Sequence, residues 1–269
     1  MSKGIDDYDV IGNDWYINEN DVNVSQTVFE NNTYQETPKT TFNKSWLTKN
    51  KVNNEAVVSF IGDSVLDNKA YTKTGKSTVD YVIDSFDNKR INFNDQSIDG
   101  YTIYDCVDTD KVNEKSDAVV ISAGGNDLLA SMPLLGVTDD TNITMGLMNS
   151  ELDKFMYAYE TMLNNLRRKG RKFLLVTCYN GNLAYNPTRF NSVDNSSLAI
   201  VSMWNDRLYS LANRLNSYPN TNLGQSFDVL DTRNFMSVKC YYNEIEPNER
   251  GAKRIAKHIT NWINHNGVL

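Results

Sequence analysis

The chain has 269 residues, of which 34 are acidic and 27 are basic, giving a formal net charge of −7. A chain of this length can bury a core without disulfides or a structural metal, and its acidic balance argues against nucleic-acid binding, which depends on Lys and Arg neutralising phosphates. The widely spaced Cys106, Cys178 and Cys240 form neither a disulfide framework nor a metal motif, so a reducing compartment is expected.

Targeting and membrane signals are missing from the sequence as given. No apolar run approaches the ~18 residues that a membrane-spanning helix needs, and the N-terminal region lacks the basic-then-apolar layout of a signal peptide. We therefore expect a cytoplasmic protein without a membrane span. Only two histidines are present, His258 and His265, so any histidine-based chemistry has few options.

The excess charge is concentrated at the N-terminus. Residues 1–36 hold eight acids and one base, which gives −7, whereas the remaining 233 residues hold 26 acids and 26 bases. The acidic segment is rich in Asn and Asp and shows no sustained period, which predicts a flexible tail over residues 1–40. Its scattered aromatic residues leave open a tail that packs along the domain surface. The folded domain, residues 41–269, is expected to be close to neutral and to offer no case for steering a charged partner.

The body of the chain alternates short β-branched runs with longer amphipathic stretches, as in βαβ units around a parallel sheet. The predicted strands cover residues 56–61, 91–97, 117–122, 172–177 and 226–230, the second of them the weakest. The predicted helices cover residues 77–86, 150–168, 197–216 and 249–264. An α/β domain built on a parallel sheet is therefore expected.

Ligands of an open parallel sheet bind at the carboxyl ends of its strands, so the residues directly after each strand matter most. Gly62-Asp63-Ser64 follows the first predicted strand, and Gly124-Gly125-Asn126-Asp127 follows the third. A serine in such a turn can present its hydroxyl to a cleft, and an Asn amide can donate to a developing oxyanion. Taken alone, each motif is more typical of a turn or a helix cap.

The two motifs in this order, with Ser97-Ile98-Asp99-Gly100 between them, resemble the first three sequence blocks of the SGNH (GDSL-like) hydrolase family. The resemblance covers roughly residues 55–265. It implies a three-layer, flavodoxin-like α/β/α sandwich and hydrolysis of esters of lipids, carbohydrates or other small acyl groups. By position, Ser64 resembles the nucleophile, with Asp63 supporting it. The backbone N–H groups of Ser64 and Gly100, with the Asn126 side chain, would form the oxyanion hole, and Gly124 would support Asn126. No metal or organic cofactor is implied.

The last block departs from the family pattern, Asp-x-x-His-Pro followed by a helix. Here the matching stretch is Asn243-Glu244-Ile245-Glu246-Pro247, so Asn243 stands at the acid position and Glu246 at the histidine position. His258 lies about three helical turns further on and His265 is near the end of the chain. Neither His258 nor His265 is expected to act in place of the histidine of the family's last block.

A carboxylate can take the proton of a serine, but an ordinary Glu pKa of ~4.3 makes it a weaker base than histidine. Burial could raise that pKa, and Asn243 need not stabilise a cation if the base is a carboxylate. Two interpretations stay open: an ester hydrolase with Glu246 as base, or an inactive relative that binds an ester or glycan ligand.

A third interpretation, nucleotide binding, is suggested by Gly75-Lys76-Ser77-Thr78, which looks like the end of a P-loop. The motif lacks its first glycine, because position 70 is Ala, and it does not directly follow a strand. Lys76 is therefore expected near the start of an ordinary surface helix.

Two further stretches are candidates for the cleft. Tyr179, Asn180 and Asn182 follow the fourth predicted strand and are expected to line it, although the high Asn content of the chain is an equally good explanation. Residues 128–144 carry Met and Leu side chains next to Asn126. We interpret them as a long loop with apolar residues packed beneath it, or alternatively as a lid or acyl-facing wall.

Overall fold

The computed structural model describes residues 55–86, 91–107, 112, 116–167, 170–181, 195–217, 225–266 and 268. The predicted tail over residues 1–40 lies outside this part of the chain, as does Asn182. The strands are β1 (Ala56–Gly62), β2 (Ile91–Ser97), β3 (Ser116–Ser122), β4 (Gly170–Val176) and β5 (Ser226–Leu230). All five predicted strands are thus confirmed to within two residues at each end.

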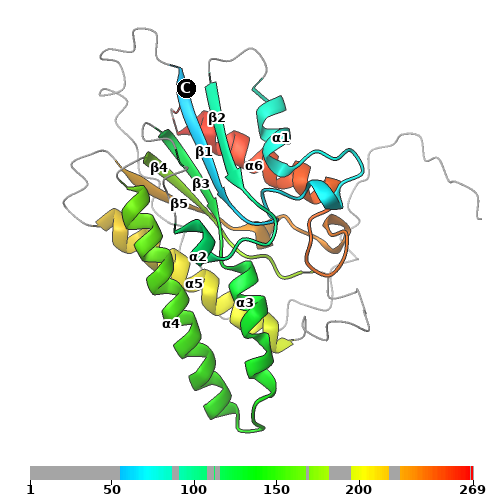
Figure 1. Ribbon diagram of the computed structural model, residues 1–269, viewed down its shortest axis with the longest axis vertical. Helices are drawn as coiled ribbons and strands as arrows, with labels where there is room; N and C mark the ends of the chain where they lie inside the picture. Colours follow the sequence, from blue (N-terminus) through cyan, green and yellow to red (C-terminus); the bar gives the residue numbers. More distant parts are fainter. Residues whose placement is uncertain are drawn as a thin grey trace, which may run out of the picture. The chain divides into compact units, whose positions relative to one another are not determined.

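The strands form one sheet in the order β2-β1-β3-β4-β5, and every neighbouring pair is parallel (Figure 1). This is the flavodoxin-like order, in which the chain leaves β1 toward one edge and returns to continue on its other side. The point where the order reverses lies between β1 and β3. Polar residues that follow these two strands therefore meet at the crevice where ligands of such sheets bind.

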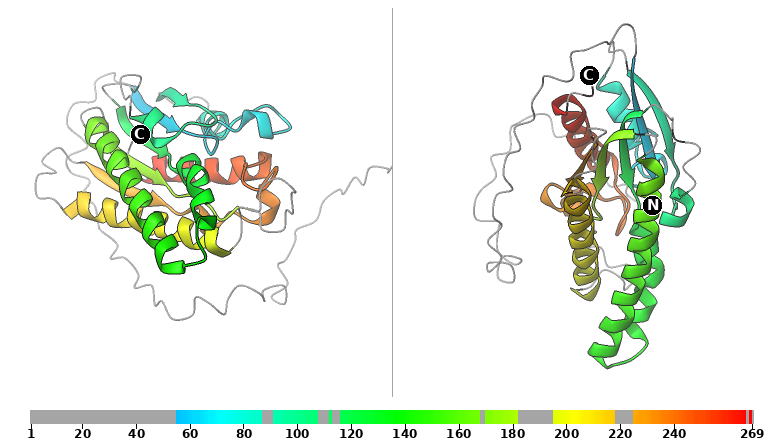
Figure 2. Two further views of the ribbon diagram at one scale, coloured as in Figure 1. Left: turned by 60° about the horizontal axis from the view of Figure 1, so that its bottom comes forward. Right: turned by 90° about the vertical axis from the view of Figure 1, so that its left-hand side faces the viewer.

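Both faces of the sheet are covered by helices, as Figures 1 and 2 show. Apolar side chains of α1 and α6 pack with Val58 and Phe60 on one face, and those of α4 and α5 pack with Ile121 and Phe173 on the other. Successive residues of a buried strand point to opposite faces, so a continuous apolar run serves both layers. The three-layer α/β/α architecture is as predicted. The longer helices are α1 (Thr78–Asp84), α3 (Gly125–Ser131), α4 (Thr141–Leu166), α5 (Asn195–Ser217) and α6 (Glu249–His265).

The stretch over residues 128–144 is not a long loop, and this prediction was wrong. It contains α3, a 3-10 turn at Met132–Gly136 and the first turn of α4. Gly124 takes a positive φ of 112° as the residue before α3, so the helix starts within the Gly-Asn-Asp run that looked like loop sequence. Asp140 accepts hydrogen bonds from the N–H groups of Asn142 and Ile143 and so begins α4 well before residue 150. The α3–α4 hairpin extends past the carboxyl end of the sheet (Figure 1).

The short helix α2 (Ile103–Cys106) follows β2, and no helix in the described part of the chain combines the length and apolarity that crossing a bilayer requires. Cys106, Cys178 and Cys240 are all free thiols.

Candidate active site

The turn after β1 is held tightly against the end of β3. A side chain at Gly62 would place its Cβ only 2.0 Å from the carbonyl oxygen of Ser122, so only glycine fits there. The N–H of Asp63 donates to the same carbonyl at 3.0 Å, and the N–H of Ile98 donates to the carbonyl of Gly62 at 2.9 Å. The turn that presents Ser64 is therefore fixed by the backbones that follow β2 and β3.

Ser64 opens into a pocket at the carboxyl end of the sheet. The pocket unites three of the predicted positions, Ser64, Asn126 and Glu246, with Tyr179 and Asn180 after β4. Its apolar side chains come mainly from α3 and α5. The other described residues in its lining are Asp63, Val65, Ser122, Gly125, Leu128, Leu129, Met132, Thr177, Cys178, Gly181, Ser197, Leu198, Val201 and Ile245.

Ser64 and Glu246 line this pocket together, and their side chains are close enough for hydrogen bonding with Ser64 to act on the pKa of the Glu246 carboxyl group. Burial raises the pKa of Glu246 above its usual value, while the hydrogen bond from Ser64 lowers it and the charge of Asp99 raises it further. The Oε2 atom of Glu246 is buried and has no hydrogen-bond partner among the described residues. The two residues that the sequence pairs as nucleophile and base thus face the same pocket.

Asn243 does not contact the Glu246 side chain but holds its backbone. The Oδ1 atom of Asn243 accepts hydrogen bonds from the N–H groups of Ile245, at 3.0 Å, and Glu246, at 2.7 Å. The N–H of Tyr242 in turn donates to the carbonyl of Glu246 at 2.7 Å. The loop before α6 is therefore a closed turn, and Asn243 supports Glu246 through the main chain.

Asn68, which the sequence does not single out, ties the serine loop to the glutamate loop. It is fully buried. Its Nδ2 donates to the carbonyl of Pro247 at 2.9 Å, and its Oδ1 accepts from the N–H of Thr78 at 2.8 Å. Because Ser64 and Pro247 belong to segments far apart in the chain, this side chain is a direct brace between them. No local pattern marks Asn68, since its partners become neighbours only in the folded protein.

Asn126 links the third sequence block to the second. Its Nδ2 donates to the carbonyl of Tyr101 at 2.8 Å, directly after Gly100. The second hydrogen of this amide remains as a possible donor toward the pocket. Gly100 has a φ of +85° in the turn after β2 and is not among the described residues that line the pocket.

Gly124 supports this arrangement sterically. A Cβ at this position would lie 2.5 Å from the indole ring of Trp204, a fully buried side chain of α5. The absence of a side chain at Gly124 lets α5 approach the start of α3, which carries Asn126. This matches the geometric role expected for the glycine of the third block.

Two buried aspartates brace the site from below. Asp63 accepts hydrogen bonds from the Ser122 hydroxyl at 2.9 Å and from the N–H of Val65 at 3.1 Å, and burial raises the pKa of Asp63 to about 7. Asp127 accepts from the N–H of Ile103 at 2.9 Å, which fixes α2 against α3. Burial also raises the pKa of Asp127. Both carboxyl groups stabilise the backbone around Ser64 and Asn126.

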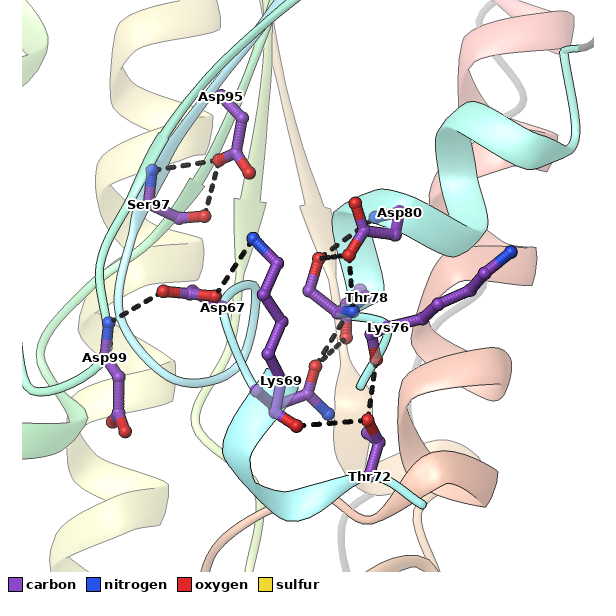
Figure 3. Close-up of polar contacts among 11 residues, drawn as sticks. Asp67, Lys69, Thr72, Lys76, Thr78, Asp80, Asp95, Ser97 and Asp99 are labelled. Atoms are coloured by element: carbon purple, nitrogen blue, oxygen red, sulfur yellow. Dashed lines mark hydrogen bonds and ion pairs between the residues drawn. The ribbon is translucent and has the colours of Figure 1, made fainter. Parts of the chain in front are cut away.

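Figure 3 shows how the loops after β1 and β2 are joined at their exposed side. The Asp67 carboxylate accepts from the N–H of Asp99 at 3.4 Å and lies 3.6 Å from the Lys69 ammonium group. Asp99 also accepts a hydrogen bond from the Tyr71 hydroxyl at 2.7 Å. Burial and the Asp99 carboxylate hold the pKa of Tyr71 well above its usual value, so this hydroxyl stays a donor.

The remaining candidates lie away from the pocket. The ring of His258 stacks on Phe235 at a centroid distance of 4.0 Å, and Nδ1 of His265 lies 2.6 Å from the carbonyl oxygen of Asn261. Lys76 precedes α1 and pairs with Asp84 at 2.7 Å, while Ser77 caps α1, so Lys76 lies at the start of a surface helix as predicted. Among the described residues, no group of three or more His, Cys, Asp or Glu side chains is arranged to hold a metal ion.

The pocket wall contains apolar residues from two helical segments. Leu129 and Met132 come from the α3 segment, and Leu198 and Val201 come from α5. The alternative of an acyl-facing wall next to Asn126 therefore describes the α3 segment better than packing under a loop does. The residues of α5 gave no signal, because their helical period shows that they share a face but not that this face meets Ser64.

Comparison with solved structures identifies the fold. A lipase from a goat rumen metagenome matches with a TM-score of 0.57 and 18% identity, over 77% of this chain and 96% of that one. An acetylxylan esterase from Geobacillus stearothermophilus matches with a TM-score of 0.54 and 16% identity, over 78% and 95%. A protein described as a putative GDSL-like lipase from Parabacteroides merdae has a TM-score of 0.54 and 12% identity, over 81% and 98%.

Sequence comparison alone does not reach these proteins. No family model matches the chain, and no curated protein matches it. The identities to the solved structures are all low, so the likeness concerns the course of the backbone. The chain therefore has an α/β fold that it shares with solved structures described as a putative acylhydrolase, a lipase, an acetylxylan esterase and a putative GDSL-like lipase.

Proposed function

We propose that the protein is a serine ester hydrolase of the SGNH type in which Glu246 takes the place of the usual histidine. The observation that carries the proposal is the placement of Ser64 and Glu246 in one pocket at the switch point of the sheet, with their side chains close enough to interact. A nucleophile within hydrogen-bond reach of a base is the minimum constellation for acyl transfer. The esterases and lipases that share the fold support the same reaction class.

In this mechanism the Ser64 oxygen attacks the ester carbonyl carbon while its proton passes to the Glu246 carboxylate. The N–H groups of Ser64 and Gly100 and the Asn126 amide hold the resulting oxyanion. The intermediate then collapses, the carbon–oxygen bond to the alcohol breaks, and protonated Glu246 gives its proton to the leaving oxygen. A water molecule, deprotonated by Glu246, then attacks the acyl-enzyme carbonyl. The bond between the acyl carbon and the Ser64 oxygen breaks, Glu246 returns the proton to that oxygen, and the acid is released.

The surroundings of Glu246 suit this double role. A carboxyl group with an ordinary pKa would be a weak base, and burial at this position raises the pKa toward the working range. No cation forms during the reaction, so the Asn243 position needs no carboxylate. Asn243 instead orders the turn that aims Glu246 at Ser64.

The pocket volume of about 80 Å³ favours a small acyl group. Leu128, Leu129, Met132 and Val201 offer an apolar wall, while Tyr179 and Asn180 add polar groups to the lining. We infer a carboxylic ester of a small, lipid or carbohydrate substrate, and no cofactor takes part.

The second candidate function is binding of an ester or glycan ligand without turnover. It is favoured by one observation, that no histidine is among the described residues that line the pocket. In this case Ser64 and Glu246 would serve as hydrogen-bonding groups for the ligand. The two functions differ in a single measurable property, which is Ser64-dependent release of product.

The test is hydrolysis of short p-nitrophenyl esters between about pH 4 and 9 by the native protein, Ser64→Ala and Glu246→Gln. Turnover that is abolished by the first change and reduced about 10²- to 10⁴-fold by the second supports the hydrolase. No Ser64-dependent turnover at any pH, together with saturable ester binding, supports the binding protein. Restoration of turnover by Glu246→His with Asn243→Asp would then show that only the base was lost.

A further inference from the structure

A second, open groove lies beside the proposed active site, between residues 70–73 and the N-terminal half of α6. It is distinct from the pocket that holds Ser64, and the two share no lining residue among those described. Its described lining is Ala70, Tyr71, Thr72, Lys73, Tyr241, Tyr242, Asn248, Glu249, Arg250, Lys253, Arg254 and Lys257. This surface takes no part in the reaction proposed above.

The groove is strongly cationic in a protein with a net charge of −7. Five of its lining residues are Lys or Arg, and the only carboxylate in the lining as described is Glu249, which pairs with Lys253 at 2.6 Å. Within the described part of the chain, Lys73, Arg250 and Lys257 are exposed and have no acidic partner within ion-pairing distance. Unpaired cations gathered in a concave surface raise the local concentration of anions.

The cations on α6 form a row. Arg250, Arg254 and Lys257 lie at positions i, i+4 and i+7 of the helix, so they share one face. With a rise of about 1.5 Å per residue, the row extends for about 10 Å along the helix axis. A single small anion would engage only part of it, whereas a chain with repeated negative charges would match its length.

The groove also contains tyrosines. Tyr242 is 64% exposed, and its ring lies 5.8 Å from that of Tyr71, centroid to centroid. Flat rings with a polar edge suit ligands that are apolar on one side and hydroxylated on the other, as sugars are. The wall formed by residues 70–73 is held in place by Thr72. Its hydroxyl donates to the carbonyls of Lys69 and Lys76 at 3.2 and 2.9 Å (Figure 3).

The tyrosines place one end of the groove next to the pocket. The Tyr241 ring packs edge-to-face on Tyr179, which lines the pocket, at 5.2 Å. Tyr242 donates its N–H to the carbonyl of Glu246. The turn over residues 241–246 thus separates the two sites, with Glu246 on one side and the tyrosines on the other.

We propose that this groove binds the chain of an acidic, O-acylated oligosaccharide whose ester group enters the pocket at Ser64. The inference rests on the proposed hydrolase function and specifies its substrate class. The row of cations pairs with repeated negative charges on the glycan, and Tyr71 and Tyr242 contact its sugar rings. The cationic groove therefore selects the polymer, and the apolar pocket selects the acyl group.

Binding is tested on the full chain carrying Ser64→Ala, titrated with oligogalacturonate and with neutral xylo-oligosaccharide at low and high salt. The probe variant adds Arg250→Gln and Lys257→Gln, and the matched control adds Lys154→Gln and Arg214→Gln, which remove the same charge from the other side of the sheet. We expect oligogalacturonate to bind more tightly than the neutral sugar. The probe variant should bind it about tenfold more weakly, and the control should not change. High salt should remove most of the difference.

Turnover separates this inference from the proposed function. With Ser64 intact, the probe variant should hydrolyse p-nitrophenyl acetate at the native rate but show about tenfold lower kcat/KM on acetylated oligogalacturonate, through KM. Equal binding of the acidic and neutral sugars, or equal losses in probe and control, overturns the groove assignment. So does groove-dependent binding to phosphatidylglycerol vesicles without binding to oligogalacturonate. Groove-dependent binding in a protein that hydrolyses no ester would instead overturn the proposed function alone.

Discussion

The side-chain oxygen of Asn243 accepts the backbone N–H of Glu246 at 2.7 Å. An asparagine and a glutamate that look like two losses from a catalytic pair are thus joined in one turn. Asn243→Ala should remove the side-chain oxygen that accepts from the N–H groups of Ile245 and Glu246. We expect this change to lower stability by about 1–2 kcal/mol and to reduce the esterase kcat. Asn243→Asp keeps an acceptor at the same place and is the control. Urea denaturation and p-nitrophenyl ester kinetics measure both effects. Equal kcat in the Ala and native proteins would exclude a positioning role for Asn243.

Asn68 should be as important as the residues in the pocket. Asn68→Ala leaves the Pro247 carbonyl and the Thr78 N–H without partners in a buried site, which costs about 2–3 kcal/mol. Asn68→Asp retains the acceptor for Thr78 and removes only the donor to Pro247. If the brace aims Glu246 at Ser64, the Asp variant should lose kcat by a larger factor than its loss of stability suggests. Thermal denaturation and kinetics are measured on the same samples. A native kcat, calculated per folded molecule of the Asp variant, would show that Asn68 has only a structural role.

The two glycines before Asn126, Gly124 and Gly125, should differ sharply in how much stability is lost when each is replaced by alanine. Gly124→Ala combines a positive φ with a Cβ 2.5 Å from the Trp204 ring and should cost about 3 kcal/mol. Gly125→Ala, whose Cβ would lie 3.4 Å from the nearest carboxylate oxygen, should be close to neutral. Denaturant unfolding of the two variants gives the comparison. Similar losses for both would contradict the packing described for the start of α3.

The pH profile of the esterase should report the Glu246 carboxyl group. Because the proposed base must be ionised, kcat/KM should rise with pH, and burial places the midpoint above the usual value of ~4.5 for Glu. Glu246→His should move that midpoint toward about 6.5. Asp84→Asn, a change of an exposed carboxylate beside Lys76, serves as the control and should leave the profile in place. A profile that is unaffected by Glu246→His would remove Glu246 from the base role.

Stability should also depend on pH through Asp63. Its pKa of about 7 lies above that of the unfolded chain, so the folded state holds a proton that the unfolded state has lost. The Asp63 contribution is therefore fully present below about pH 4 and is lost as pH rises to about 7, with a change on the order of 4 kcal/mol. Asp63→Asn should flatten this part of the stability curve, and Asp206→Asn, an exposed control, should not. Parallel curves for the Asp63 variant and the native protein would show that folding does not shift the pKa of Asp63.

Much of the fold could be predicted because the relevant signals are local. The central strands at Ala56–Gly62 and Ser116–Ser122 are runs of mostly apolar residues that pack on both faces of the sheet, so their sequences alone predict them. The start of α4 could not be read in this way. Residues 141–149 include Asn, Thr and Gly, which lower helix propensity, and the helix forms because Asp140 caps it and its buried side chains pack against the core.

Some features of the candidate site could likewise be predicted from local sequence, and others depend on the tertiary structure. The residues after each strand could be named in advance, because parallel strands bring their carboxyl ends to one edge and Ser64, Asn126 and Tyr179 each lie within four residues of the end of a strand. The sequence also showed that Glu246 stands where the resemblance would place a histidine. Its position in the same pocket as Ser64, the role of Asn243 as a backbone acceptor and the brace at Asn68 could not be predicted. They depend on how two loops nearly 180 residues apart are held together.

The charge distribution gives the clearest contrast. The sequence by itself determined that the excess of acid lies in residues 1–36 and that the rest of the chain is neutral. Only the tertiary structure decided that this neutral body concentrates cations in one groove. Helical periodicity shows that Arg250, Arg254 and Lys257 share a face, but nothing local tells that this face meets Lys73 and the tyrosines beside Glu246. Net charge is a sum over residues, whereas a binding surface depends on where the fold places them.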